Sequence, residues 1–306
     1  MQGTLDGFTY GLVTPVAAFV MACLGGALGL RCTTRSVRTE GSFKPGWLAL
    51  GALSIGSGIW SMHFIAMMGF SIDEVPITYD RPITYASLAV AVVMVGIGIF
   101  IVGYRGATVM ALVTGGTIMG LGVASMHYLG MAGMRFQGRV EYSTPIVILS
   151  VVIAVVAATA ALWAAVSIHG FRASLAASLV MGVAVTGMHY TGMASVSVHL
   201  HGNLRALGTG DSPTSLLMPM LVGPGVFFLL AAVVVMFDPL LVMGEPEWSG
   251  GVRKEVPLPG IPARSARTAP TVPLAHRSTG HPGDTWSAGW PGEQPPRREQ
   301  PYSDSW

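Results

Sequence analysis

Long uncharged apolar runs occupy most of the chain up to residue 237 and restrict it to a membrane fold. Seven runs approach the roughly 20 residues with which an α-helix crosses about 30 Å of hydrocarbon, and none contains Asp, Glu, Lys or Arg. Because a segment in lipid must satisfy its own backbone hydrogen bonds, we predict an all-α, polytopic membrane bundle of seven transmembrane helices. The runs span residues 10–30, 46–70, 84–104, 107–134, 145–168, 174–199 and 214–237.

The charges between the runs predict how the chain is oriented. Loops with an excess of Lys and Arg stay in the cytoplasm. The loop after the first run is basic and the loop after the second is acidic, which predicts a multi-pass protein of the cell membrane with its N-terminus outside and its C-terminus in the cytoplasm. The basic loop has Arg31, Arg35, Arg38 and Lys44 against Glu40, and the acidic loop has Asp73, Glu74 and Asp80 against Arg81.

The composition changes after residue 244. Residues 245–306 are rich in proline, carry scattered charges and show no apolar periodicity, which is typical of a disordered segment. We therefore predict a seven-helix membrane domain over residues 1–244, followed by a Pro-rich, disordered cytoplasmic tail over residues 245–306. The tail is too short for a folded output domain, so we expect any signal to pass to a separate protein.

One short sequence motif, which we call the repeated phrase, occurs three times, over residues 62–67, 126–131 and 188–193, at intervals of 64 and 62 residues. Each copy begins with Met-His, and the copies lie in the second, fourth and sixth runs. Those helices point in the same direction in the predicted topology. The pattern therefore predicts three parallel two-helix repeats between residues 46 and 199, with the first and seventh helices flanking them.

Histidine is costly inside a membrane, so a repeated histidine at one depth indicates a function. A methionine four residues after each histidine lies only about 40° away around the helix and can face the same site. The methionine before each histidine lies about 100° away and could reach the site only across a helix interface. The candidate metal ligands are Met62, His63, Met67, Met126, His127, Met131, Met188, His189 and Met193.

Small residues accompany each copy of the phrase. A glycine stands seven residues before each histidine, and a glycine or alanine stands three residues after it. Such residues permit the close approach of neighbouring helices. A three-fold arrangement of the repeated helices would bring the imidazoles together in the outer half of the bilayer. The small residues are Gly56, Gly120 and Gly182 before the histidines, and Ala66, Gly130 and Gly192 after them.

Imidazole and thioether ligands favour copper, particularly the soft monovalent ion. Haem is the main alternative, because His and Met are also its axial ligands, and zinc remains an option through the imidazoles alone. A purely structural interpretation also stays open, in which methionines fill gaps and each histidine donates to a carbonyl of a neighbouring helix.

The third copy, M-H-Y-T-G-M over Met188–Met193, resembles the signature of the MHYT integral-membrane sensor domain, and the other two copies resemble its variants. Phe64 departs from the usual tyrosine. The resemblance covers residues 8–244 and implies a copper-binding sensor of oxygen, carbon monoxide or nitric oxide, with the methionines and histidines named above as ligands. Many relatives are joined to cytoplasmic cyclic-di-nucleotide enzymes or histidine kinases.

We therefore expect a membrane signalling sensor, with a copper transporter or metal-delivery protein, or a haem-binding membrane protein, as the alternatives. We expect no enzymatic activity, because the apolar runs contain no evident nucleophile, carboxylate pair or phosphate-binding loop. The expected partners are the lipid bilayer, a diatomic gas and an unidentified cytoplasmic signalling protein, and no nucleic acid is expected.

Overall fold

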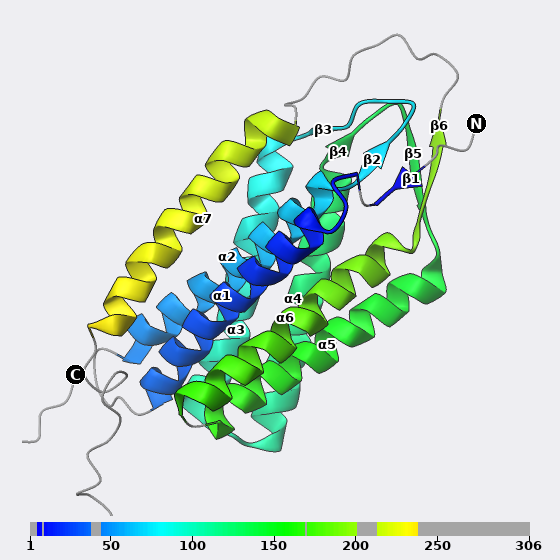
Figure 1. Cartoon of the computed structure of the whole chain (residues 1–306). Helices are drawn as coiled ribbons and strands as arrows, with labels where there is room; N and C mark the ends of the chain where they lie inside the picture. Colours follow the sequence, from blue (N-terminus) through cyan, green and yellow to red (C-terminus); the bar gives the residue numbers. More distant parts are fainter. Residues whose placement is uncertain (1–4, 8, 38–43, 169, 201–212, 238–306) are drawn as a thin grey trace, which may run out of the picture. The chain divides into compact units, whose positions relative to one another are not determined.

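The computed structural model describes residues 5–7, 9–37, 44–168, 170–200 and 213–237. The chain divides into two units, Met1–Gly251 and Val252–Trp306, and the second unit lies outside the described residues, as does the predicted tail. The first unit is built from helices (Figure 1), which are α1 Val13–Val37, α2 Lys44–Met68, α3 Arg81–Arg105, α4 Val109–Ala132, α5 Thr144–Ser167, α6 Phe171–Met193 and α7 Pro213–Met236.

Within the described residues, six helices, α1 to α6, are long and apolar enough to cross a membrane. In α7 the apolar segment within the described residues, Val222–Met236, is shorter than these six spans. The predicted all-helical, multi-pass membrane protein is confirmed at this level. Exposed valines lie along the outer faces of the helices, as expected for contact with lipid, for example Val156 of α5 and Val180 of α6.

Local signals explain where several helices begin and end. Asp80 caps α3 because its carboxylate accepts a hydrogen bond from the Ile83 N–H at 3.2 Å, and Thr108 caps α4 by accepting from the Ala111 N–H at 3.2 Å. Gly106 ends α3 with a φ of 73°, a conformation that favours glycine.

Helices α1 to α6 each pack against the next, and α1 also packs against α6, so the six close into a ring. Helix α2 additionally contacts both α4 and α6. Helix α1 packs against both α2 and α6, two of the helices that carry the repeated phrase. The close approach expected at the small residues is present. A Cβ atom on Gly56 would lie 2.8 Å from Val92 Cα, and one on Gly120 would lie 2.5 Å from Val155 Cα.

Short antiparallel strands join the segments that follow α2, α4 and α6. Strands β3 and β4 link the segments after α2 and α4, strands β5 and β6 link those after α4 and α6, and β1 pairs with β2. The sixth run was predicted to stay helical to residue 199, but α6 ends at Met193 and the following residues form β6. The strands are β1 Leu5–Asp6, β2 Ser71–Ile72, β3 Thr78–Tyr79, β4 Met134–Arg135, β5 Gly138–Tyr142 and β6 Val196–Leu200.

Candidate metal centre

The three repeated histidines meet inside the bundle, one from each of α2, α4 and α6. His63, His127 and His189 are each 1% exposed. Their Nδ1 atoms are separated by 3.1 Å (His63 to His189), 3.2 Å (His127 to His63) and 3.3 Å (His189 to His127). These residues form the one group of His, Cys, Asp and Glu side chains with metal-site spacing in the part of the chain that the structure describes.

Glycines on the neighbouring helices make room for two of the rings. A Cβ atom on Gly192 of α6 would lie 2.5 Å from Nε2 of His127, and one on Gly130 of α4 would overlap Nε2 of His63. In both cases, the glycine three positions after one histidine packs against the imidazole ring on the preceding repeated helix, α4 before α6 and α2 before α4. The rings meet edge to face, with interplanar angles of 79° for His63 and His127 and 88° for His127 and His189.

The Nδ1 atoms of His63, His127 and His189 form a triangle, which we call the Nδ1 triangle. Hydrogen bonds alone cannot give every pair of atoms in this triangle one donor and one acceptor. A nitrogen of a neutral imidazole is either a donor or an acceptor. In a triangle of three such atoms, at least one pair must therefore face donor to donor or acceptor to acceptor. A cation at the centre removes this conflict, because all three nitrogens can then direct their lone pairs inward.

The size of the triangle also suits a metal ion. The mean Nδ1 separation is about 3.2 Å, and dividing it by √3 places the centre about 1.8 Å from each nitrogen, so an ion slightly out of the plane lies about 2 Å from all three. Imidazole nitrogens bind first-row metals such as zinc at about 2.0–2.1 Å. The donor set that the structure brings together therefore fits one small cation with three nitrogen ligands.

The outward edges of two rings lie in apolar surroundings. Nε2 of His63 and Nε2 of His127 are buried and have no hydrogen-bond partner within the described residues. Metal-bound histidines usually donate this N–H to a carboxylate or carbonyl, which makes the ring a stronger ligand. Here packing against glycine positions the rings instead.

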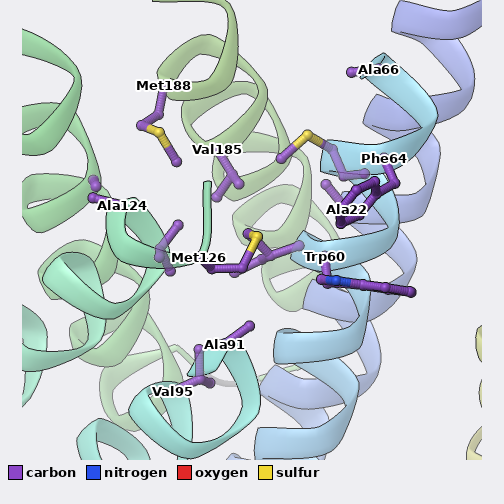
Figure 2. Close-up of a cluster of buried hydrophobic side chains, with 14 of the residues drawn as sticks. Ala22, Trp60, Phe64, Ala66, Ala91, Val95, Ala124, Met126, Val185 and Met188 are labelled. Atoms are coloured by element: carbon purple, nitrogen blue, oxygen red, sulfur yellow. The ribbon is translucent and has the colours of Figure 1, made fainter. Parts of the chain in front are cut away.

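The predicted methionine ligands lie in the apolar core. Met62, Met67, Met126, Met131 and Met188 are buried, and Met193 packs against the same cluster while half-buried. Figure 2 shows Met126 and Met188 among apolar side chains, including Val185. The structure thus brings together the three histidines, and the role of the methionines as ligands stays a prediction.

The aromatic residue after each histidine packs beside its ring. Centroid distances are 4.7 Å for His63 and Phe64, 4.8 Å for His127 and Tyr128, and 5.0 Å for His189 and Tyr190. The Tyr128 hydroxyl lies 2.7 Å from Oγ of Ser150, so it ties α4 to α5. Tyr79 of β3 packs against Phe64 with centroids 6.0 Å apart, and burial raises the pKa of its hydroxyl above the usual range.

Comparison with known proteins identifies a related group. The MHYT family, described as a bacterial signalling protein N-terminal repeat, matches residues 56–115 and 120–178. The bifunctional diguanylate cyclase/cyclic di-GMP phosphodiesterase MucR of Pseudomonas aeruginosa is 37% identical over 207 residues, which are 66% of this chain and 30% of MucR. The cyclic di-GMP phosphodiesterase NbdA of the same organism is 36% identical over 206 residues, which are 64% of this chain and 26% of NbdA.

The signalling protein YkoW of Bacillus subtilis is 30% identical over 198 residues, which are 62% of this chain and 24% of YkoW. The chain therefore spans less than a third of the length of these relatives. No solved structure matches the chain.

The expectation of no enzymatic activity is wrong for this group, because two of the relatives are named as enzymes of cyclic di-GMP turnover. That expectation rested on the apolar runs alone, and such runs carry no information about catalytic domains.

Proposed function

Because the chain belongs to the MHYT family of bacterial signalling-protein repeats, we propose that it is a membrane sensor whose three buried histidines hold one copper ion. The signal is a diatomic gas, namely oxygen, carbon monoxide or nitric oxide. His63, His127 and His189 are the ligands, and the Nδ1 triangle is the observation that carries the proposal. Copper bound there would supply a soft site that can take up such a gas.

The charge balance of the site favours monovalent copper over a divalent ion. Three neutral imidazoles bring no negative charge, and no carboxylate or thiolate joins the group within the described residues. A buried charge without a counter-charge is costly, and the cost rises with the size of the charge. A singly charged ion is therefore easier to hold here than Zn²⁺, which usually recruits a carboxylate or thiolate.

The space beside the histidines argues against haem. Cofactor pockets commonly enclose about 300–1,000 Å³. The cavity one helical turn from the histidines, lined by Ile59, Val123 and Val185, has a volume of about 10 Å³. The histidines also meet one another directly, which leaves no gap for a porphyrin between them.

We further propose the topology that the charge pattern predicts, with α7 as a seventh span, three parallel two-helix repeats and the N-terminus outside. Two observations support parallel repeats. The histidines of α2, α4 and α6 lie at one level, and the segments that leave these helices pair with one another as β3 with β4 and β5 with β6.

The residues of the site can link a bound gas to the arrangement of the helices. Each ligand comes from a different helix, so a ligand that favours one spacing of the nitrogens favours one packing of α2, α4 and α6. A gas shifts this equilibrium only as far as it binds one arrangement more tightly than the other. We propose that the shift reaches a cytoplasmic signalling partner. The names of MucR and NbdA favour an enzyme of cyclic di-GMP turnover as that partner.

Infrared spectroscopy of the copper-loaded protein under carbon monoxide tests the sensor. We expect a carbon–oxygen stretching band shifted from that of free gas in the natural chain, and no band when all three histidines are replaced by alanine. Far-ultraviolet circular dichroism shows whether the variant keeps its helices. A copper-loaded protein without any gas-dependent band contradicts the proposal. Copper uptake into vesicles that His63→Ala abolishes, without any response to gas, would instead indicate a transporter.

A further inference from the structure

A small apolar cavity lies beneath the histidine layer. Ile59, Val123 and Val185 line it, and each stands four residues before one of the three histidines. Four residues are one turn of helix, so the cavity lies on the bundle interior about 6 Å from the histidine layer along the helices. Met188, next to His189, also lines it, and Figure 2 shows Val185 and Met188 in the same buried cluster.

The cavity suits a molecule of very few atoms. Its volume of about 10 Å³ is close to the least space that can hold one water molecule. Its lining consists of Ile, Val, Ala and Met side chains, which offer no hydrogen bonds to water. Apolar cavities stay dry, and a larger one, of about 150 Å³, is known to take up xenon.

A groove on the outside of the bundle lies next to this cavity. The groove has a volume of about 440 Å³ and lies mainly between α5 and α6. Ala157, Ala161 and Met181 line both the groove and the cavity, so only these side chains stand between the two spaces. The outer rim of the groove includes Ala160 and Ala176, which are exposed on the membrane-facing surface.

We propose that small apolar molecules of diatomic size enter from the lipid between α5 and α6 and dock in this cavity beneath the histidines. Apolar solutes favour hydrocarbon over water, so the bilayer itself supplies them. The alanines leave a passage because their side chains are short, whereas a leucine at the same place would close it. That the docked molecule is also the signal rests on the proposed function. The docking itself requires no metal and is independent of that function.

Xenon binding to the metal-free, full-length protein in lipid nanodiscs tests the docking site. Methyl resonances of Val123 and Val185 should shift with xenon pressure, and Ala158→Leu, which adds three carbons to the cavity wall, should abolish the shifts. Val185→Ile is the milder variant to use if Ala158→Leu does not fold, and it should weaken them. Val156→Leu is the matched control, because Val156 is 62% exposed on the same helix and lines neither space.

The rate of xenon exchange tests the route. Ala160→Leu combined with Ala176→Leu should slow exchange severalfold and leave the equilibrium shifts unchanged, whereas Val156→Leu should alter neither. Exchange that is as fast in the double variant as in the natural chain overturns the route between α5 and α6.

The outcomes separate this proposal from the proposed function. The absence of xenon shifts at Val123 and Val185 overturns the docking site even in a protein that binds copper. Conversely, a protein that takes up xenon as described but binds no copper contradicts the proposed sensor and leaves the docking site in place.

Discussion

At the scale of single residues, glycine decides how closely the imidazoles approach one another. The Nε2 edge of His63 faces Gly130, and that of His127 faces Gly192. Within the described residues, neither Nε2 atom has a hydrogen-bond partner. Packing against glycine therefore fixes the orientation of these imidazole rings, which a hydrogen bond to a carbonyl or carboxylate usually does. A single methyl group should therefore disturb the site.

Gly130→Ala should weaken copper binding by about 10- to 100-fold, the usual effect of losing support for a ligand. The added Cβ would overlap Nε2 of His63, so the ring must leave the triangle or α4 must move. Competition with a monovalent copper chelator measures the affinity. Gly187→Ala is the control, because a Cβ there meets nothing within 4 Å. Equal losses in both variants would contradict this account.

The residue types and spacing of the repeated phrase predict the histidine cluster but not its detail. The constant offset of His and Met indicates one shared site, because packing alone does not require histidine at the same place in each repeat. Which ring nitrogen points inward depends on side-chain rotation, and the contacts of the neighbouring helix decide that rotation. The pairing of His63 with Gly130 therefore becomes visible only in the structure.

At the scale of helices and strands, buried polar contacts tie neighbouring helices together. Nε1 of Trp60 donates to Oγ of Ser87 at 3.0 Å and links α2 to α3. The Tyr128 hydroxyl and Oγ of Ser150 lie 2.7 Å apart and link α4 to α5. Ser87 and Ser150 each donate to a carbonyl of their own helix, at 2.6 and 2.8 Å, which fixes the position of the hydroxyl.

Tyr128→Phe should lower the free energy of unfolding by about 1 kcal/mol, the typical value of a hydrogen bond between transmembrane helices. Ser150→Ala should cost a similar amount, and the double variant should cost less than the sum because both changes remove the same contact. Unfolding in mixed detergent micelles provides the measurement. Tyr85→Phe on the outer face of α3 serves as the control. Fully additive losses would show that Tyr128 and Ser150 do not act together.

The ion pair between Asp80, which caps α3, and Arg135 of β4 should make stability depend on pH. Asp80 accepts from the Ile83 N–H and from Arg135 at 3.0 Å, and these hydrogen bonds lower the pKa of its carboxyl below the usual 3.8. Ionised Asp80 therefore stabilises the folded protein. This stabilisation is fully present above the pKa of Asp80 in the unfolded chain, near 4, and it is lost as the pH falls through the lower pKa of the folded protein.

The midpoint of thermal unfolding should therefore fall between about pH 4 and pH 2 by more in the natural chain than in Asp80→Asn. Asparagine still caps α3 but does not titrate. Equal pH dependence of the two proteins would contradict this assignment.

Long apolar runs predict the helices well, since hydrocarbon thickness sets their length. The strands are harder to predict, because β1 to β4 have two residues each and show no periodicity. Strand β6 is the exception, since Val196, Val198 and Leu200 alternate with polar residues in a way typical of a strand. The position of α1 between α2 and α6 cannot be predicted from its sequence, because an apolar helix surface does not specify its partner.

At the scale of the whole molecule, the proposed orientation places the strands outside and the turn between α3 and α4 in the cytoplasm. Cysteine labelling in intact cells tests it, in a background with Cys23 and Cys32 replaced by alanine. Glu141→Cys in β5 should react with an impermeant maleimide in intact cells. Arg105→Cys at the end of α3 should react only after permeabilisation. Both positions are exposed in the structure, and the reverse pattern would contradict the orientation.

The six-helix ring and the sharing of one site among three of its helices make the metal centre a property of the whole bundle. Metal content and copper X-ray absorption of the full-length protein, purified from native membranes under reducing conditions, test this account most directly. We predict one copper ion per chain with three nitrogen ligands at about 2 Å, and its loss on replacing His63, His127 or His189 by alanine. A natural chain without copper, or copper that stays bound when all three histidines are alanine, would contradict the account.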